Sequence, residues 1–154
     1  MNIFIADTNI FLDSMKMGIL PDFFALDAVL YTTQFVTAEI KYESQKKEID
    51  AFVRSRHLTV LELSGEEIEQ MNQWETVPYL KRIADRSVVW KARQLDGAIM
   101  LTGDKNMRKV ALANAIKNHG IIWVIDYMAK EGIITETTAK SLHEEVKKIN
   151  TWLQ

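Results

Sequence analysis

The amino-acid sequence predicts an α/β protein built on a parallel sheet with helices on both faces. Short apolar runs rich in β-branched residues alternate along the chain with longer segments whose apolar residues recur at helical spacing. Strands separated by helices pair in parallel, because each helix returns the chain to the starting end of the sheet. No internal repeat, low-complexity segment or long linker divides the sequence. We therefore expect one domain over residues 1–154, with a C-terminal helical tail at about 135–154.

Five short runs define the predicted sheet. The first is apolar and stops at a carboxylate, and the others combine apolar with β-branched residues. Short apolar runs of this kind are typical of strands that helices cover on both faces. The predicted strands are residues 3–6, 28–33, 58–63, 98–102 and 121–125.

The segments around these strands are predicted helices with recognisable starts. Thr8 or Asn9 is suited to cap the first helix, and Ser64 with Glu67 has the spacing of a capping box. Several of the segments also place their apolar residues along one helical face. The predicted helical segments are residues 10–15, 23–26, 37–47, 48–56, 64–71, 79–95, 106–118, 127–130 and 138–152.

The composition is that of an ordinary globular protein. Hydrophobic residues make up 47% and charged residues 26% of the 154 residues, and the formal net charge is -2. Binding of polyanions through bulk charge is therefore not indicated, although a local basic patch stays open. The absence of cysteine excludes disulfides, thiolate metal sites and cysteine nucleophiles. No signal peptide and no apolar run of membrane-spanning length occurs, so a cytoplasmic protein is the expectation.

Acidic residues stand where several predicted elements begin or end. Asp7 follows the first strand and Asp104 follows the fourth, so both lie at the carboxyl edge of the sheet, where ligands bind in such folds. Asp85 lies early in a helix that leads back to the fourth strand, and that end of the helix faces the same edge. If Thr37 caps its helix, Glu39 lies in the first turn of that helix and close to the same edge.

Four carboxylates in one cleft repel each other unless a cation compensates them. Oxygen ligands of high charge suit Mg²⁺ or Mn²⁺, which can activate a water and stabilise charge on a phosphodiester. Each acid also has a purely structural interpretation. Asp7 and Asp104 could cap the helices after them, Glu39 could gain from a helix N-terminus, and Asp85 could be an exposed helix acid.

The Asp-Thr-Asn sequence at residues 7–9 resembles the start of the PIN-domain family. The family pattern continues with an acid in each of three later places, which match Glu39, Asp85 and Asp104. The most specific part is 85–110, with an acid, a helix, a strand, Thr-Gly-Asp and another helix. The resemblance covers about residues 2–134. It implies a three-layer α/β/α sandwich with a five-stranded parallel sheet in the order 3-2-1-4-5.

The resemblance also implies a metal-dependent endoribonuclease that hydrolyses RNA phosphodiester bonds. In this family the acids bind Mg²⁺ or Mn²⁺, and water attacks the scissile phosphate. Many small bacterial members are toxins held inactive by a cognate antitoxin, and homodimers are usual, so an antitoxin protein and a second copy are implied partners. The implied metal-binding and catalytic residues are Asp7, Glu39, Asp85 and Asp104, with Thr8, Asn9 and Thr102 as small polar residues that orient them.

Basic residues flank these acids and are candidates for binding RNA phosphates, which supply affinity without specifying sequence. Arg86 directly follows Asp85, where the family commonly has a small or apolar residue. Its guanidinium could contact phosphate or pair with an acid, and Arg82 is a further basic neighbour of Asp85. The second hypothesis is thus a catalytically weak or inactive module of the same fold that binds RNA or protein. The RNA-binding candidates are Lys41, Arg86, Lys105, Arg108 and Lys109.

Overall fold

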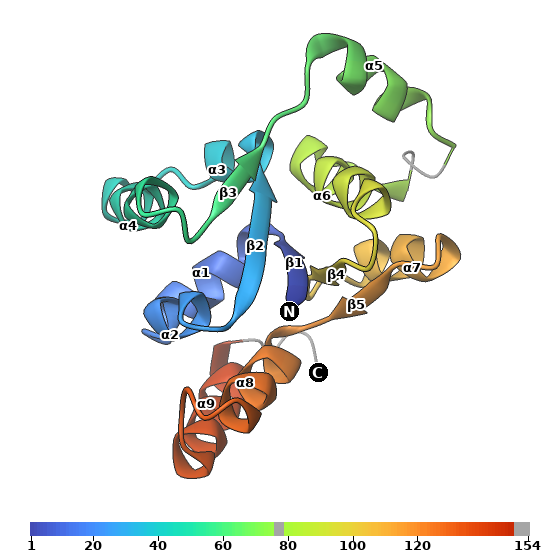
Figure 1. The fold of residues 1–154 in the computed structure, drawn as a ribbon. Coiled ribbons are helices and arrows are strands. Elements are labelled where there is room, and N and C mark those ends of the chain that lie inside the picture. Colours follow the sequence, from blue (N-terminus) through green and yellow to red (C-terminus); the bar gives the residue numbers. More distant parts are fainter. Residues whose placement is uncertain (76–78, 150–154) are drawn as a thin grey trace.

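A five-stranded parallel sheet forms the centre of the protein, in the order β3-β2-β1-β4-β5 (Figure 1). The computed structural model describes residues 1–75 and 79–149. The predicted fold class and strand order are confirmed. The strands are β1 Asn2–Ala6, β2 Ala28–Thr33, β3 Thr59–Leu61, β4 Ile99–Leu101 and β5 Lys117–His119.

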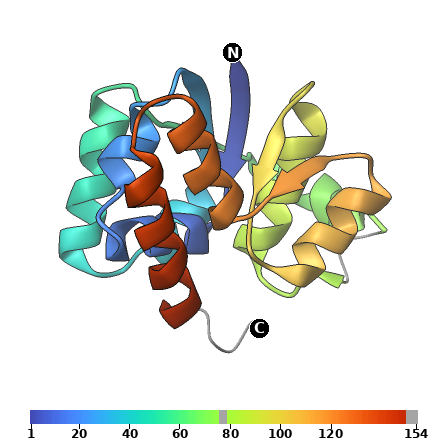
Figure 2. The ribbon, with the colours of Figure 1, turned by 90° about the horizontal axis from the view of Figure 1, so that it is seen from below.

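Helices cover both faces of this sheet. The helix α6 packs against β1, β2 and β4 on one face, beside α7, whereas α1, α2 and α8 pack together on the other. Seen from below, α9 lies along α8 and away from the sheet (Figure 2). The helices are α1 Thr8–Lys16, α2 Leu20–Phe24, α3 Gln34–Glu39, α4 Glu43–Arg54, α5 Gly65–Gln73, α6 Ile83–Gln94, α7 Lys105–Ala113, α8 Ile121–Lys130 and α9 Glu136–Ile149.

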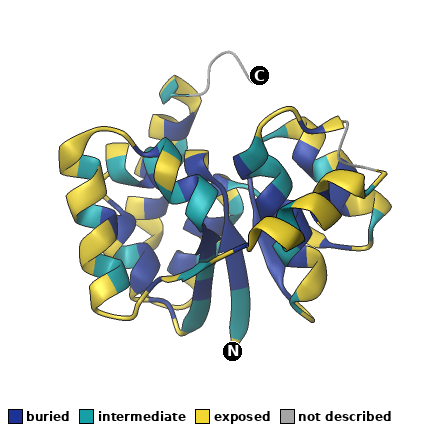
Figure 3. Ribbon diagram, turned by 90° about the horizontal axis from the view of Figure 1, so that it is seen from above, coloured by how far each residue is buried: buried dark blue, intermediate teal, exposed yellow. Residues whose placement is uncertain are grey.

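The central strands are buried toward their carboxyl ends, which are dark blue in Figure 3, whereas the first residues of β1 and β2 are teal. Phe4 and Ile5 of β1 and Met100 and Leu101 of β4 expose at most 1% of their surface. The ladder continues past the strand ends, because the Asp7 N–H donates to the Leu101 carbonyl at 3.1 Å. The sheet therefore fixes the backbone at the point where the first acid begins.

The fifth strand was predicted in the wrong place. Residues 121–125 begin α8, and β5 is the preceding polar segment. The buried residues of α8 recur at helical spacing, since Ile121, Val124, Ile125 and Met128 face the core while Ile122 is 39% exposed. Most of the β-branched residues that suggested a strand therefore belong to the buried stripe of a helix.

The helix that carries Glu39 also differs from the prediction. Thr33, rather than Thr37, caps α3, and its hydroxyl accepts a hydrogen bond from the Val36 N–H at 3.4 Å. Glu39 is consequently the last residue of α3 instead of lying in a first turn. A separate helix, α4, then begins at Glu43.

Other helix ends were predicted with mixed success. Ser64 caps α5 by accepting from the Glu67 N–H at 3.2 Å, as the capping-box spacing predicts. The predicted helix of residues 106–118 ends earlier, at Ala113, and Ala115 has a left-handed backbone with φ of 57°. The predicted C-terminal helix is α9, and its predicted end at Trp152 lies outside the described residues. Within the described ranges, no helix is long and apolar enough to cross a membrane.

Candidate active site

Asp7 is the buried centre of the candidate site. It leaves the end of β1 and is only 3% exposed. Its Oδ1 accepts from the Ile10 N–H at 3.0 Å, so Asp7 itself caps α1, and the prediction that Thr8 or Asn9 does so was wrong. Burial raises the pKa of Asp7 to about 7. The hydrogen bonds from Thr102 and Ile10 oppose this rise, while the nearby charges of Asp85 and Asp104 add to it.

Thr102 connects Asp7 to Asp104. Its hydroxyl, which is fully buried just after β4, donates to Asp7 Oδ2 at 2.5 Å. The same oxygen accepts from the Asp104 N–H at 3.1 Å. Asp104 then caps α7 by accepting from the Met107 N–H at 2.9 Å. A single side chain therefore fixes the relative positions of the two acids, a placement that suits the orienting role predicted for Thr102.

Asp85 lies in the first turn of α6, which covers the face of the sheet opposite to α1. It is half-buried, and its pKa is raised by burial and by the charge of Asp104, while Arg82 lowers it. Asp7, Asp85 and Asp104 therefore influence one another electrostatically, and we refer to them as the acid cluster. The structure brings these three predicted residues to one edge of the sheet.

A hydroxyl pair holds the start of α6 against the sheet. Ser87 and Thr33 share a buried hydrogen bond of 2.7 Å, and Ser87 also donates to the Ala84 carbonyl at 2.7 Å. The sequence did not mark either residue as part of the site, because Thr33 ends a predicted strand and Ser87 lies inside a predicted helix. Their contact positions the turn that carries Asp85.

Glu39 is held by contacts to Thr8 and Arg82. Its carboxylate accepts from the Thr8 hydroxyl at 3.1 Å and forms an ion pair with Arg82. Arg82 immediately precedes α6. The structure thus gives Thr8 an orienting contact to an acid, and it places Arg82 on Glu39 rather than leaving it solely for phosphate. Asn9 is exposed and lines a cavity of about 390 Å³ together with Asp104.

The donor chemistry of the acid cluster fits a hard divalent cation. All its ligand atoms are carboxylate oxygens, and burial together with the charge of neighbouring acids raises the pKa of both Asp7 and Asp85. Among the described residues, however, no group of three or more histidine, aspartate or glutamate side chains is already placed to hold a metal ion. The cluster therefore has suitable ligands without a preformed coordination sphere.

The RNA-binding candidates differ in exposure. Lys41, Lys105 and Lys109 are exposed, whereas Arg108 is half-buried, with its Nε donating to the Thr102 carbonyl at 3.2 Å. Arg86 is half-buried, and its Nε has no hydrogen-bond partner among the described residues.

The chain is thus an α/β protein whose parallel strands deliver Asp7 and Asp104 to one carboxyl edge of the sheet, where such folds bind ligands. A family model described as a PIN domain matches residues 3–154, and the chain belongs to the PIN-domain family. The comparison with curated proteins found no match. PIN domains are typically nucleases, they generally use divalent metal ions, and their fold suggests RNA binding.

Proposed function

We propose that this protein is a metal-dependent endoribonuclease that hydrolyses RNA phosphodiester bonds, with Mg²⁺ or Mn²⁺ held by the acid cluster. The observation that carries the proposal is the pair of hydrogen bonds by which Thr102 links Asp7 to Asp104. Asp7 is a buried acid whose pKa is raised, and its ionised form lowers the stability of the fold. Acids with such perturbed pKa values cluster at functional sites.

In this proposal Asp7, Asp85 and Asp104 bind the cation, and Glu39 completes the site. The bound cation would supply a water nucleophile at neutral pH and would offset charge on the scissile phosphate. The chain's own contribution is orientation. Thr102 directs Asp7 Oδ2, the Ile10 N–H donates to Asp7 Oδ1, and the Met107 N–H donates to Asp104 Oδ1.

The experiment compares wild type with Asp104→Asn on a fluorescently labelled single-stranded RNA in Mn²⁺. Asparagine keeps the cap of α7, because its side-chain oxygen can still accept from the Met107 N–H. We expect wild type to cut and Asp104→Asn to lose cutting while it melts at a similar temperature. The matched control is Asp50→Asn, an exposed acid on α4, which should cut like wild type. Equal cutting by wild type and Asp104→Asn would refute the assignment.

We further propose that the nuclease is the toxin of a toxin–antitoxin pair, that it binds an antitoxin protein, and that it acts as a homodimer in the cytoplasm. This further proposal rests on family membership, since PIN domains are typically nucleases. Induced expression of the chain in bacteria should arrest growth, and the same level of Asp104→Asn should not. If both proteins are tolerated equally although wild type cuts RNA in vitro, the toxin role fails and the nuclease stands.

The alternative is a catalytically inactive module that binds RNA or protein. The ion pair between Arg82 and Glu39 is the observation that favours it, because it engages one of the four predicted acids. An inactive module would bind RNA without cutting it in Mn²⁺, and its melting temperature would not rise with the metal.

A further inference from the structure

A large groove lies on the side of α7 that faces α8 and α9. Its volume is about 940 Å³, at the upper end of the roughly 300–1,000 Å³ typical of ligand pockets. Three helices and the connection from β5 to α8 line it, and Figure 2 shows α7 and α9 on opposite sides of that connection. We call this feature the basic groove. None of the four predicted acids lines it.

The basic groove is continuous with the acid site. Gly103, Lys105 and Ile121 line both the groove and the smaller cavity that contains Asp104. A chain bound along the groove would therefore reach the acid cluster without leaving the surface of the protein.

Positive charge dominates the walls of the groove, although the whole chain has a net charge of -2. Lys105 and Arg108 contribute from α7, and Lys140 and Lys147 contribute from α9. The acid among the lining residues is Glu144, whose contact with Lys147 is long, at 3.4 Å, and solvent-exposed on both sides. An exposed pair of this kind contributes little, so the cations stay available to an anionic ligand.

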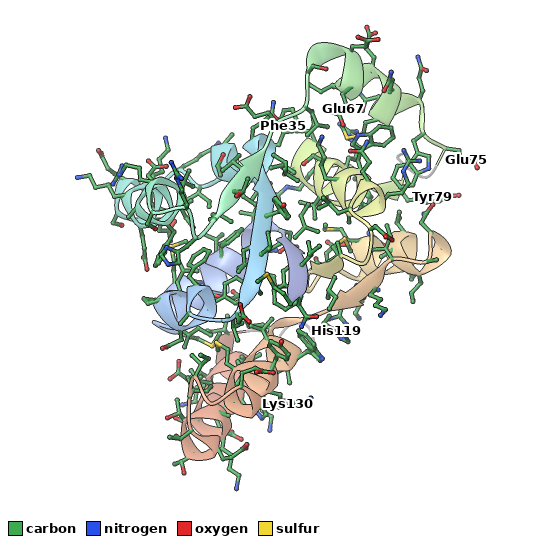
Figure 4. The ribbon with its side chains drawn as sticks, viewed as in Figure 1. Phe35, Glu67, Glu75, Tyr79, His119 and Lys130 are labelled. Atoms are coloured by element: carbon green, nitrogen blue, oxygen red, sulfur yellow. The ribbon has the colours of Figure 1, made fainter. Side chains whose placement is uncertain are left out.

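The floor of the groove is apolar and aromatic. Ile122 is 39% exposed there, and Trp123 stacks on His119 with ring centroids 4.2 Å apart and an interplanar angle of 4°. Tyr127 stacks on the other side of this column at 5.0 Å from Trp123. Burial and the charge of Arg108 lower the pKa of His119, which favours the neutral, aromatic form of its ring. Figure 4 labels His119 close to the start of α8.

Cations beside an apolar, aromatic floor match the two parts of an unpaired nucleotide chain. Lysine and arginine neutralise phosphates, while unstacked bases gain from contact with aromatic and apolar side chains. A duplex keeps its bases stacked inside and cannot use such a floor. A protein partner is disfavoured, because its anionic side chains would have to match four separate cations.

We propose that the basic groove binds single-stranded RNA and guides it to the acid cluster, with Lys140 and Lys147 on phosphates and Ile122 under the bases. This inference rests on the proposed nuclease function, whose substrate-binding surface it extends from α7 to α9. Neither lysine of α9 was among the residues that the sequence marked for RNA binding.

The test measures binding without cleavage, by fluorescence anisotropy in EDTA with a labelled single-stranded oligouridine of about 12 nucleotides. Lys140→Gln combined with Lys147→Gln should weaken binding roughly tenfold at low salt. The slope of log affinity against log salt should fall in magnitude by about 0.7 for each lost phosphate contact. The matched control combines Lys130→Gln with Lys148→Gln, which removes the same charge from exposed positions of α8 and α9 outside the groove. This control should bind nearly as wild type does.

The apolar floor has a separate readout. Ile122→Ser should weaken single-strand binding without changing the salt slope, and an RNA duplex of similar length should bind more weakly than the single strand. The proposal is overturned if the groove and control variants bind equally, or if the duplex binds as tightly as the single strand. It is also overturned if no RNA binds.

These outcomes are distinguishable from failure of the nuclease. Groove-dependent binding with no cutting in Mn²⁺ would support the RNA-binding role of the basic groove and refute the nuclease function. Metal-dependent cutting that is unaffected by both α9 substitutions would support the nuclease function and refute the role of the groove.

Discussion

Replacing Asp7 with asparagine should stabilise the protein at neutral and alkaline pH when no metal is present. Asp7 is buried, and its pKa rises from 3.8 to about 7 in the folded chain. Asparagine resembles the neutral acid in size and retains an oxygen for the Ile10 N–H, but it carries no charge to bury. The substitution therefore removes a cost that the folded state carries whenever this carboxyl ionises.

The sign and size of the effect follow from the two pKa values. Below pH 3.8 the carboxyl is protonated in both states, so it contributes no pH dependence. Between pH 3.8 and about 7 the unfolded chain releases the proton and the folded chain keeps it, so wild-type stability falls as pH rises. Above pH 7 the full cost applies, at about 4 kcal/mol as an upper value, since one pKa unit corresponds to about 1.4 kcal/mol.

The assay is urea unfolding of wild type and Asp7→Asn in EDTA at about pH 4 and pH 8. The difference in unfolding free energy should be near zero at the lower pH and should reach several kcal/mol at the higher one. Asp50→Asn, on the exposed face of α4, should show no comparable change. A difference between Asp7→Asn and wild type that is the same at both pH values would refute the reasoning, because other titrating groups are common to both proteins.

Two further predictions concern the contacts around the acid cluster. Thr102→Val should destabilise the fold by about 1–3 kcal/mol in urea unfolding, because the Asp104 N–H and Asp7 Oδ2 lose their hydrogen-bond partner. Thr102→Ser keeps the hydroxyl and should retain most of the wild-type stability. A valine variant as stable as wild type would contradict this view of the contact. Arg82→Gln should cost less than about 1 kcal/mol, since the arginine side chain is 60% exposed, and it should enlarge the rise in melting temperature caused by Mn²⁺. An unchanged metal response would show that Glu39 takes no part in binding.

The sequence predicted the layout of the sheet and the edge where the acids gather. Asp7 and Asp104 each follow a short apolar run, and parallel strands bring such run ends to the same edge. Their assignment as catalytic residues stays a prediction that the cleavage experiment tests.

Local patterns failed where tertiary contacts decide the structure. The apolar residues at 121–125 suit a strand or a helix over so short a window, and packing of α8 on α1 and α2 selects the helix. Thr33 reads as the end of a strand, so its role as the cap of α3 was missed and Glu39 was assigned to the wrong end of its helix. The pairing of Arg82 with Glu39 joins α3 to the residue before α6, and no spacing along the chain encodes it.

The link between Thr102 and Asp7 also sets when the site can exist during synthesis. The two residues are 95 positions apart in the chain, and their strands are adjacent at the middle of the sheet. A nascent chain that ends before β4 lacks Asp104 and leaves Asp7 without the hydroxyl that directs it. Long-range pairing of this kind forms late, because it closes a large loop. A ribosome-bound chain would thus lack the complete acid cluster until more than two-thirds of it had been made.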